Sequence, residues 1–275
     1  MSSDGFRYEG RRVLVVGGAT GMGAAAAKTA SELGADTIVM DIAPIDFPAT
    51  QTVRVDLRDE NDIDTALGQI AAPIDAIFSC AGVADGTSGL MLINFISQRH
   101  VIDRLLEQGK LGGGAAAAVA MISSGAGMGW QNNLPQALEF LACSDWESAS
   151  KWIESHPGTD NYVFSKQVMN AYVAHESFAL ARKGVRLNAV LPGPTDTPLA
   201  RANADVWLPF GEPFRKELGV GPLAPEHVGD TLAFLCSDAA SGINGVTLTI
   251  DYGHTSASMT GAYDDPLVRG LLGIG

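Results

Sequence analysis

The chain has 275 residues, of which 46% are hydrophobic, so it can bury a substantial core as one large α/β domain or as two smaller ones. Its formal net charge of −13 argues against nucleic acids and anionic membrane surfaces as partners. The sequence has no apolar run of the roughly 18 residues that a spanning helix needs and no signal-peptide pattern at its N-terminus, so we expect a cytoplasmic protein.

Short apolar runs alternate with helical patterns along most of the chain. The predicted strands are 13–16, 37–40, 52–55, 76–79, 117–122, 185–190 and 246–250. The predicted helices are 21–33, 60–70, 90–109, 160–183 and 225–237. Several strands are apolar throughout, which is typical of a parallel sheet covered on both faces. We therefore predict one α/β domain over residues 1–275, with a Rossmann-type, doubly wound parallel sheet of about seven strands and helices on both faces.

Three segments depart from this alternation. Residues 125–156 contain two short helical patterns and predict an insertion that serves as an active-site wall or an interface element. Residues 196–222 hold several aromatic side chains among prolines and glycines, which indicates a lid over a substrate or else a surface helix packed on the core. The tail, 256–275, has little pattern and is expected to be disordered or folded across a partner.

A glycine-rich loop follows the first predicted strand. Gly17, Gly21 and Gly23 flank Thr20 and Met22 and lead into an alanine-rich helix. Glycines allow a tight turn and a close approach of the backbone to a pyrophosphate, which the helix N-terminus then faces. A turn that serves only chain reversal would leave this spacing unexplained. The loop therefore predicts a dinucleotide site.

Asp41 and Ile42 follow the second strand, about 20 residues after the glycine loop, where a carboxylate accepts hydrogen bonds from the adenosine ribose. The same charge repels a 2′-phosphate, so we expect NAD rather than NADP; a solvated turn aspartate is the alternative. Asp56 and Leu57 end the third strand, at the expected adenine edge. Residues 80–82 (Cys80, Ala81 and Gly82) end the fourth strand, where close backbone approach is expected beside the ribose.

Tyr162 and Lys166 are four residues apart in a predicted helix, so a phenol and an ammonium lie one turn apart on one face. A free phenol has a pKa of about 10, and a neighbouring cation favours the phenolate, which can exchange a proton with an alcohol. This spacing is common by chance, so its meaning depends on the residues around it. The cysteines Cys80, Cys143 and Cys236 lack metal-site spacing, and we expect reduced thiols and no metal.

From about residue 11 to residue 253, the chain resembles the short-chain dehydrogenase/reductase family. Gly17, Gly21 and Gly23 match the family's glycine loop, and Tyr162 and Lys166 match its Tyr-x-x-x-Lys motif. Ser79-Cys-Ala-Gly replaces the family's Asn-Asn-Ala-Gly, which removes side-chain hydrogen bonds that usually brace this loop. The loop with Pro192, Gly193, Thr195 and Thr197 matches the segment that contacts the nicotinamide in the family.

The resemblance implies reversible hydride transfer between a secondary alcohol and NAD. Tyr162 would take the hydroxyl proton and Ser124, with Ser123 as its competitor, would hydrogen-bond the same oxygen. Lys166 would bind the nicotinamide ribose and lower the pKa of Tyr162, and Asn94 would hold a proton-relay water. Each has a plain structural alternative, since serines end strands and asparagines cap helices.

The long gap between Ser124 and Tyr162 is similar to that of the bacterial 3α-hydroxysteroid dehydrogenase/carbonyl reductase group. This resemblance implies a bulky hydrophobic substrate, most simply a hydroxysteroid, with a terpene or aryl alcohol as the alternative. The expected substrate-binding residues are Ser124, Trp130, Tyr162, Leu199, Trp207 and Phe210. A non-catalytic NAD-sensing regulator and an epimerase of the family's extended branch are further alternatives. The family resemblance also implies a homodimer or homotetramer.

Overall fold

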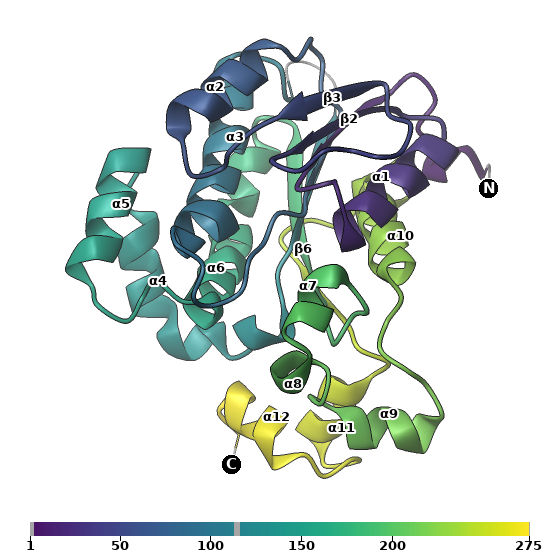
Figure 1. Cartoon of the computed structure of the whole chain (residues 1–275), viewed down its shortest axis with the longest axis vertical. Helices are drawn as coiled ribbons and strands as arrows, with labels where there is room; N and C mark the ends of the chain where they lie inside the picture. The colour runs from purple at the N-terminus through teal and green to yellow at the C-terminus, as the bar shows by residue number, and fades with distance from the viewer. Residues whose placement is uncertain (1–2, 113–115, 275) are drawn as a thin grey trace.

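The computed structural model describes residues 3–112 and 116–274, and within them seven parallel strands form one sheet in the order β3-β2-β1-β4-β5-β6-β7 (Figure 1). The strands are β1 Arg12–Val16, β2 Asp36–Asp41, β3 Gln51–Arg54, β4 Ala76–Ser79, β5 Ala117–Ile122, β6 Val185–Pro192 and β7 Thr247–Ile250. The predicted strands and the doubly wound, Rossmann-type sheet are confirmed. The strand order reverses between β1 and β4, the place where such sheets bind ligands.

Helices cover both faces of the sheet. On one face lie α1 (Gly21–Glu32) and α10 (Pro225–Cys236), and on the other α2 (Glu60–Gly68), α3 (Ser97–Glu107) and α6 (Tyr162–Ala181) (Figure 1). Strand β1 is buried on both sides: Val13 and Val15 belong to the core under α1 and α10, whereas Leu14 and Val16 belong to the core under α3 and α6. This period of two explains why the four residues after Arg12 are all apolar.

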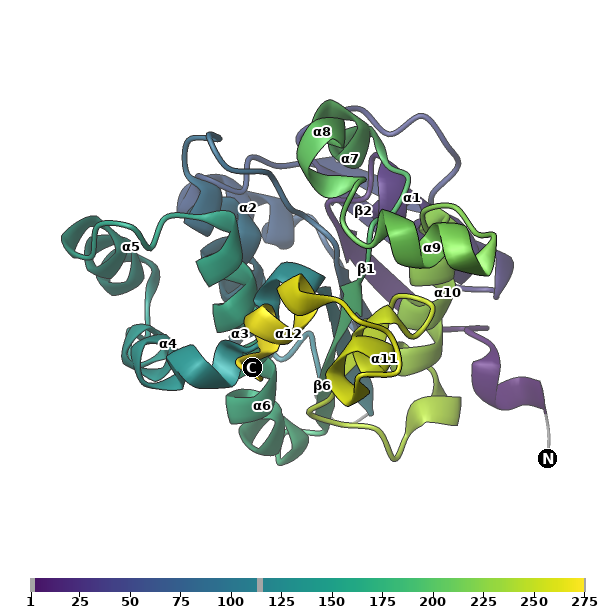
Figure 2. The ribbon, with the colours of Figure 1, turned by 90° about the horizontal axis from the view of Figure 1, so that it is seen from below.

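Five short helices gather beyond the carboxyl ends of the strands. The 196–222 segment forms α7 (Pro198–Ala202), α8 (Ala204–Trp207) and α9 (Glu212–Leu218), and the C-terminal segment forms α11 (His254–Thr260) and α12 (Pro266–Leu272). In Figure 2, α11 and α12 lie between α9 and α6. The tail therefore folds on its own chain over the described residues; Gly275, its last residue, lies outside them.

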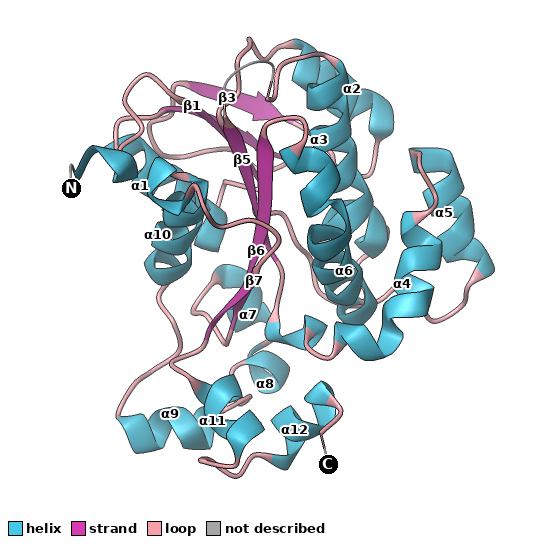
Figure 3. Cartoon of the chain, turned by 180° about the vertical axis from the view of Figure 1, so that it is seen from behind, coloured by secondary structure: helices cyan, strands magenta, loops and turns pink. Residues whose placement is uncertain are grey.

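The 125–156 segment consists of two 3₁₀ turns, Gly125–Gly127 and Trp130–Asn133, followed by α4 (Leu134–Leu141) and α5 (Trp146–Ser155). These two helices match the predicted pair and lie on the outer side of α6 (Figure 3). Phe140 on α4 is fully buried, and its ring centroid lies 5.8 Å from that of Phe95, 5.1 Å from Trp152 and 6.0 Å from Phe164. The insertion thus extends the hydrophobic core across α6.

In the described part of the chain, no helix combines the length and apolar character that crossing a bilayer requires.

Candidate active site

The glycine loop after β1 is too tightly packed for larger residues. Gly17 and Gly21 have φ values of +80° and +56°, which glycine adopts without strain. A Cβ on Gly17 would lie 2.4 Å from Ala81 Cα, and one on Gly23 would lie 2.1 Å from the Gly17 carbonyl oxygen. Thr20 precedes α1 but its side chain makes no capping hydrogen bond, so the first amides of this helix are left to an external acceptor. The loop fits a pyrophosphate.

Asp41 is fixed beside this loop. Its Oδ2 accepts a hydrogen bond from Ala19 N at 2.9 Å and its Oδ1 accepts one from Ala43 N at 2.9 Å. The carboxylate therefore stands at the end of β2 next to the glycine loop, as a ribose-binding aspartate requires. Ile42 beside it is 48% exposed, which leaves its side chain open to a ligand.

Asp56 is held in a two-pronged pair with Arg58, whose Nε and Nη2 donate to it at 2.9 and 2.6 Å. Hydrogen bonding to this guanidinium holds the pKa of Asp56 below its usual value. Leu57 is buried in the core. Cys80 is partly buried, and burial raises the pKa of its thiol, which favours the protonated form near neutral pH.

Gln98 on α3 supplies the brace that the altered Ser79–Gly82 segment was expected to lack. Its Nε2 donates to Ala81 O at 2.8 Å and to Asn94 O at 2.9 Å, and its Oε1 accepts from Ser79 Oγ at 2.5 Å. The side chain is 1% exposed. The sequence analysis did not identify this residue. Its position one helical turn after Asn94 was the available signal.

The nicotinamide-side loop follows β6, which ends at Pro192. A Cβ on Gly193 would lie 3.2 Å from Asp251 Cβ, so the loop passes close to the end of β7. Thr195 Oγ1 donates to Gly193 O at 2.9 Å. Thr197 caps α7 by accepting from Ala200 N at 3.1 Å, and its Cγ2 would lie 3.2 Å from a Cβ on Gly21. The start of the lid segment therefore touches the glycine loop.

Two side chains cap the N-terminus of α6 and thereby place Tyr162. Asn161 Oδ1 accepts from Phe164 N at 2.8 Å. Asp85, from the loop after β4, accepts from Tyr162 N at 2.7 Å. The sequence analysis did not predict Asp85, because nothing local links positions 85 and 162. Its charge also acts on the phenol and raises the pKa of Tyr162.

Lys166 lies one turn further along α6 and is 2% exposed. Its Nζ donates to Ile122 O at 2.8 Å and lies 5.5 Å from the centroid of the Tyr162 ring. Burial lowers the pKa of Lys166 to about 8. Because burial also disfavours the phenolate, the pKa of Tyr162 is raised, although hydrogen bonding with Ser124 opposes this. The expected lowering of the tyrosine pKa by Lys166 is thus not found in the cofactor-free chain.

The two serines after β5 face different neighbours. Ser123 is 2% exposed and its Oγ donates to Lys166 O at 3.3 Å, so it ties the strand to α6. The Ser124 hydroxyl opposes the burial that raises the pKa of the Tyr162 phenol, and its Oγ accepts from Ala126 N at 3.1 Å. Of the pair, Ser124 is the serine that lies beside the phenol.

Asn94 lies in a π-helical turn, Leu92–Ile96, directly before α3. Its Oδ1 accepts from Val83 N at 2.8 Å and its Nδ2 donates to Ser165 Oγ at 3.2 Å. A Cβ on Gly82 would lie 3.9 Å from Asn94 Oδ1 and 3.8 Å from Lys166 Nζ. Asn94 therefore connects the loop after β4 to α6, close to Lys166.

The predicted substrate residues lie in different places. The ring of Trp207 is 5.0 Å from that of Tyr162 and therefore covers the phenol. Leu199 is half-buried, and its carbonyl accepts from Asn203 at 2.9 Å. Trp130, which belongs to the 125–156 insertion, is partly buried and packs against the hydrophobic core. The ring of Phe210 lies 5.7 Å from that of His254.

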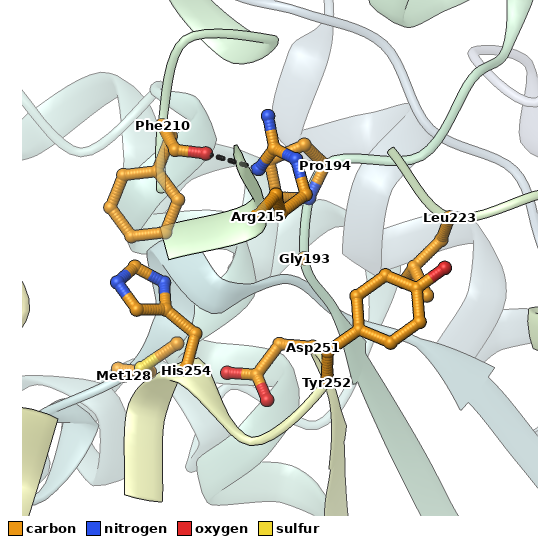
Figure 4. A pocket seen from close by; sticks show the side chains of 9 residues that line it. All are labelled: Met128, Gly193, Pro194, Phe210, Arg215, Leu223, Asp251, Tyr252 and His254. Atoms are coloured by element: carbon orange, nitrogen blue, oxygen red, sulfur yellow. Dashed lines mark hydrogen bonds between the residues drawn. The ribbon is translucent and has the colours of Figure 1, made fainter. Parts of the chain in front are cut away.

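Phe210 and His254 belong to a small hollow under the lid (Figure 4). Its lining is Met128, Gly193, Pro194, Phe210, Arg215, Leu223, Asp251, Tyr252 and His254. Ser124, Tyr162 and Lys166 are not part of this lining. The hollow therefore marks the junction between the lid and the C-terminal helices rather than the place of proton transfer.

Comparisons with known proteins agree with this geometry. A family model described as enoyl-(acyl carrier protein) reductase matches residues 148–255. The cis-4-hydroxycyclohexanecarboxylate dehydrogenase of Sinomonas cyclohexanicum is 29% identical over 267 residues, which are 92% of this chain and 99% of that protein. The 3-alpha-hydroxysteroid dehydrogenase/carbonyl reductase of Comamonas testosteroni is 29% identical over 252 residues, which are 88% and 95% of the two chains. The 3-alpha-hydroxysteroid dehydrogenase of Pseudomonas sp. B-0831, solved with NADH, is 26% identical with a TM-score of 0.72, covering 92% of this chain and 100% of its own.

Proposed function

This chain belongs to the short-chain dehydrogenase/reductase family, and we propose that it is an NAD(H)-dependent enzyme that interconverts a secondary alcohol and a ketone on a bulky hydrophobic substrate. One observation carries the proposal: Ser124 follows β5 at the carboxyl end of the sheet and its hydroxyl acts on the phenol of Tyr162, while the buried Lys166 lies one turn behind the tyrosine with its Nζ 5.5 Å from the phenol ring. This arrangement provides a proton-transfer group and an oxyanion donor at one point.

The cofactor site is built from the chain's own backbone and one carboxylate. The loop of Gly17, Gly21 and Gly23 would hold the pyrophosphate, and Asp41 would accept the ribose hydroxyls. Lys166 would hold the nicotinamide ribose, together with the loop that starts at Gly193. When bound, the nicotinamide exchanges a hydride with the carbinol carbon.

Side chains of this chain carry out the proton transfer. In oxidation, Tyr162 accepts the hydroxyl proton as the ketone forms, and in reduction it returns that proton. Ser124 donates a hydrogen bond to the same substrate oxygen and so stabilises the negative charge that develops on it. Asn94 would hold a water near Lys166 through which the proton reaches solvent. Trp207 lies against the tyrosine ring and would exclude bulk water from this point.

The raised pKa of Tyr162 predicts opposite pH dependences for the two directions. The phenol is the acid needed for ketone reduction, and the phenolate base needed for oxidation becomes populated only as pH rises. At saturating cofactor, kcat/KM for alcohol oxidation should therefore rise from neutral to alkaline pH, whereas kcat/KM for ketone reduction should fall.

Asp85→Asn removes a charge that raises the pKa of Tyr162 and should move both pH profiles to lower pH. Asp160→Asn, which alters the neighbouring cap of Met91 N, is the matched control; profiles unmoved by Asp85→Asn would contradict the prediction.

Replacement of Asp41 should alter cofactor choice. Asp41→Ala removes the charge that repels a 2′-phosphate, so the preference for NAD over NADP should fall by about 10- to 100-fold, given 1.4 kcal/mol per factor of ten. The ratio of kcat/KM values with the two cofactors measures this change. Asp46→Ala, an equal loss of charge at an exposed site further along the same loop, should leave the ratio unchanged. If Asp41→Ala keeps the wild-type preference for NAD over NADP, the role assigned to Asp41 is wrong.

For the substrate, we propose a hydroxysteroid, with terpene and aryl alcohols as the second choice. The apolar character of the side chains around the phenol, above all Trp207, supports a bulky apolar ring system. NADH formation across a panel of steroid, terpene and aryl alcohols tests this choice. The highest kcat/KM should fall among the steroids; a higher value for a terpene or aryl alcohol would replace the substrate, and no turnover by any member would reject the function.

The retention of both Tyr162 and Lys166 favours an enzyme over a non-catalytic NAD sensor. We further propose a cytoplasmic homodimer or homotetramer of single-domain subunits. The insertion, packed on the outer side of α6, would lie at a subunit contact rather than over the substrate. A light-scattering mass equal to one chain would contradict this assembly.

A further inference from the structure

A buried histidine–carboxylate pair lies outside the catalytic residues. His254, at the start of α11, is 4% exposed, and its Nε2 lies 2.9 Å from Oδ2 of Asp265. The other oxygen of Asp265 accepts from Leu267 N at 3.0 Å and Val268 N at 3.2 Å, and thereby caps α12. One carboxylate thus fixes the position of both C-terminal helices.

The histidine ring also supports the lid from beneath. It is stacked on Phe214 of α9 with ring centroids 4.7 Å apart, and Phe210 lies against it (Figure 4). Gly211 leaves room for the ring, because a Cβ there would lie 2.7 Å from its Nδ1 and Cε1 atoms. Tyr263, which precedes α12, contacts Phe214 at 4.9 Å. The lid therefore rests on side chains of the C-terminal segment.

A second set of contacts connects this support to the catalytic tyrosine. Arg215, next to Phe214, is 7% exposed and donates to Phe210 O and to Leu208 O, each at 2.6 Å. These bonds fix the turn between α8 and α9. The ring of Trp207, which precedes Leu208, lies against that of Tyr162 at a tilt of 35°. The placement of Trp207 over the phenol thus depends on the same turn that rests on His254.

The C-terminal segment also contacts the 128–132 stretch that follows Ser124. Thr255 Oγ1 donates to Asp251 Oδ2 at 2.5 Å and lies 3.5 Å from Met128 Sδ. Gly129 admits the backbone of α12, because a Cβ there would lie 2.0 Å from Leu271 O. Figure 2 shows α11 and α12 between the lid and α6. The segment therefore contacts both the lid and the stretch that follows Ser124.

We propose that His254 and Asp265 are positioning residues that hold the lid, with Trp207, over Tyr162, so that residues 254–274 set the affinity for a bulky substrate. This inference rests on the proposed function for its kinetic part. Neither residue touches the reacting atoms; they act through Phe214, Arg215 and Trp207. Neither side chain belongs to the glycine loop, so the affinity for NADH should depend on them far less than the affinity for the substrate does.

The test compares Asp265→Asn with Asp264→Asn in the full-length protein. Asparagine still caps a helix, so the first variant weakens chiefly the bond to His254. Asp264 is exposed, one residue away, and undergoes the same loss of charge. The rate of amide hydrogen exchange in residues 204–218, without substrate or cofactor, reports how firmly the lid is held. The kcat, the KM for the best alcohol of the panel and the NADH Kd report on catalysis, substrate affinity and cofactor affinity.

Asp265→Asn should speed exchange across 204–218 and raise KM by about 10-fold, with kcat and the NADH Kd changed less than about 3-fold. Asp264→Asn should change none of these quantities.

His254→Phe keeps a ring against Phe214 but loses the bond to Asp265, so its effects should match those of Asp265→Asn. The double variant should be no worse than either single variant. Unchanged exchange in both single variants, or a KM equal to the wild-type value, would overturn the proposal. If no alcohol is turned over, the proposed function fails, while lid exchange still decides whether the pair holds the lid.

Discussion

Tyr162→Phe is expected to lower kcat by about 10³-fold or more, because proton transfer by a positioned side chain contributes roughly 10²- to 10⁴-fold and no neighbouring group replaces the phenol. The variant keeps the ring that contacts Trp207 and the backbone amide that donates to Asp85. The NADH Kd should therefore stay within about 2-fold of the wild-type value. Steady-state kinetics and fluorescence titration with NADH measure the two quantities.

Tyr172→Phe provides a matched control on the same helix. Tyr172 is 3% exposed and packs edge-on against Phe95 at 5.4 Å, far along α6 from the catalytic end. This change removes the same oxygen atom and should leave kcat close to the wild-type value. If Tyr162→Phe kept comparable turnover, another group would have to move the proton, and the catalytic assignment would be wrong.

Gly23→Ala is expected to raise the NADH Kd by about 100-fold, an effect of the size that a displacement of about 1 Å causes in a positioned site. The new Cβ would lie 2.1 Å from the Gly17 carbonyl oxygen, which is backbone and cannot turn away as a side chain can. The loop must therefore shift, and overpacking of this kind also costs about 1–3 kcal/mol of stability. NADH titration together with urea unfolding separates the two effects.

Gly68→Ala, at the end of α2, is the control for this substitution. A Cβ at Gly68 has no heavy atom within 4 Å, and alanine is the better helix former. It should leave NADH binding unchanged and stability equal or slightly higher. NADH binding that is unaffected by Gly23→Ala would show that the glycine loop is not the pyrophosphate cradle.

The sheet could be predicted because its signal is local. Strand β1 is buried on both faces beyond Arg12, so its next four residues are all apolar, and similar runs marked the other strands. Gly17 and Gly23 could be identified because tight packing excludes larger residues at their positions. Tyr162 and Lys166 were found by their helical spacing. In each case, the physical requirement acts on residues that are close in the sequence.

The helices beyond the sheet could not be predicted for the opposite reason. The lid and tail helices have only 4 to 7 residues each, too few to be stable alone. They depend on distant contacts such as the His254–Asp265 pair and the bonds of Arg215. The sequence analysis placed Phe210 in the substrate site, but the structure puts its ring against His254, which no local pattern indicates.

The direction in which the pKa of Tyr162 shifts could not be predicted either, because it depends on distant parts of the chain. The spacing to Lys166 predicted a lowered value, yet burial of the phenol and the charge of Asp85 raise it. Burial is a collective result of the whole fold, and Asp85 comes from another element. Gln98, whose amide braces the loop after β4, was missed because its partners Ser79 and Ala81 lie on a different element.

The central claim is that a hydride passes from a substrate carbinol carbon to NAD while Tyr162 takes the hydroxyl proton. The most direct measurement uses the best alcohol of the panel with deuterium at the carbinol carbon, and analyses the NADH formed by mass spectrometry. We predict one deuterium per NADH, on a single face of the nicotinamide, and none formed by Tyr162→Phe at a comparable rate. NADH without deuterium, or equal transfer by the phenylalanine variant, would contradict the account.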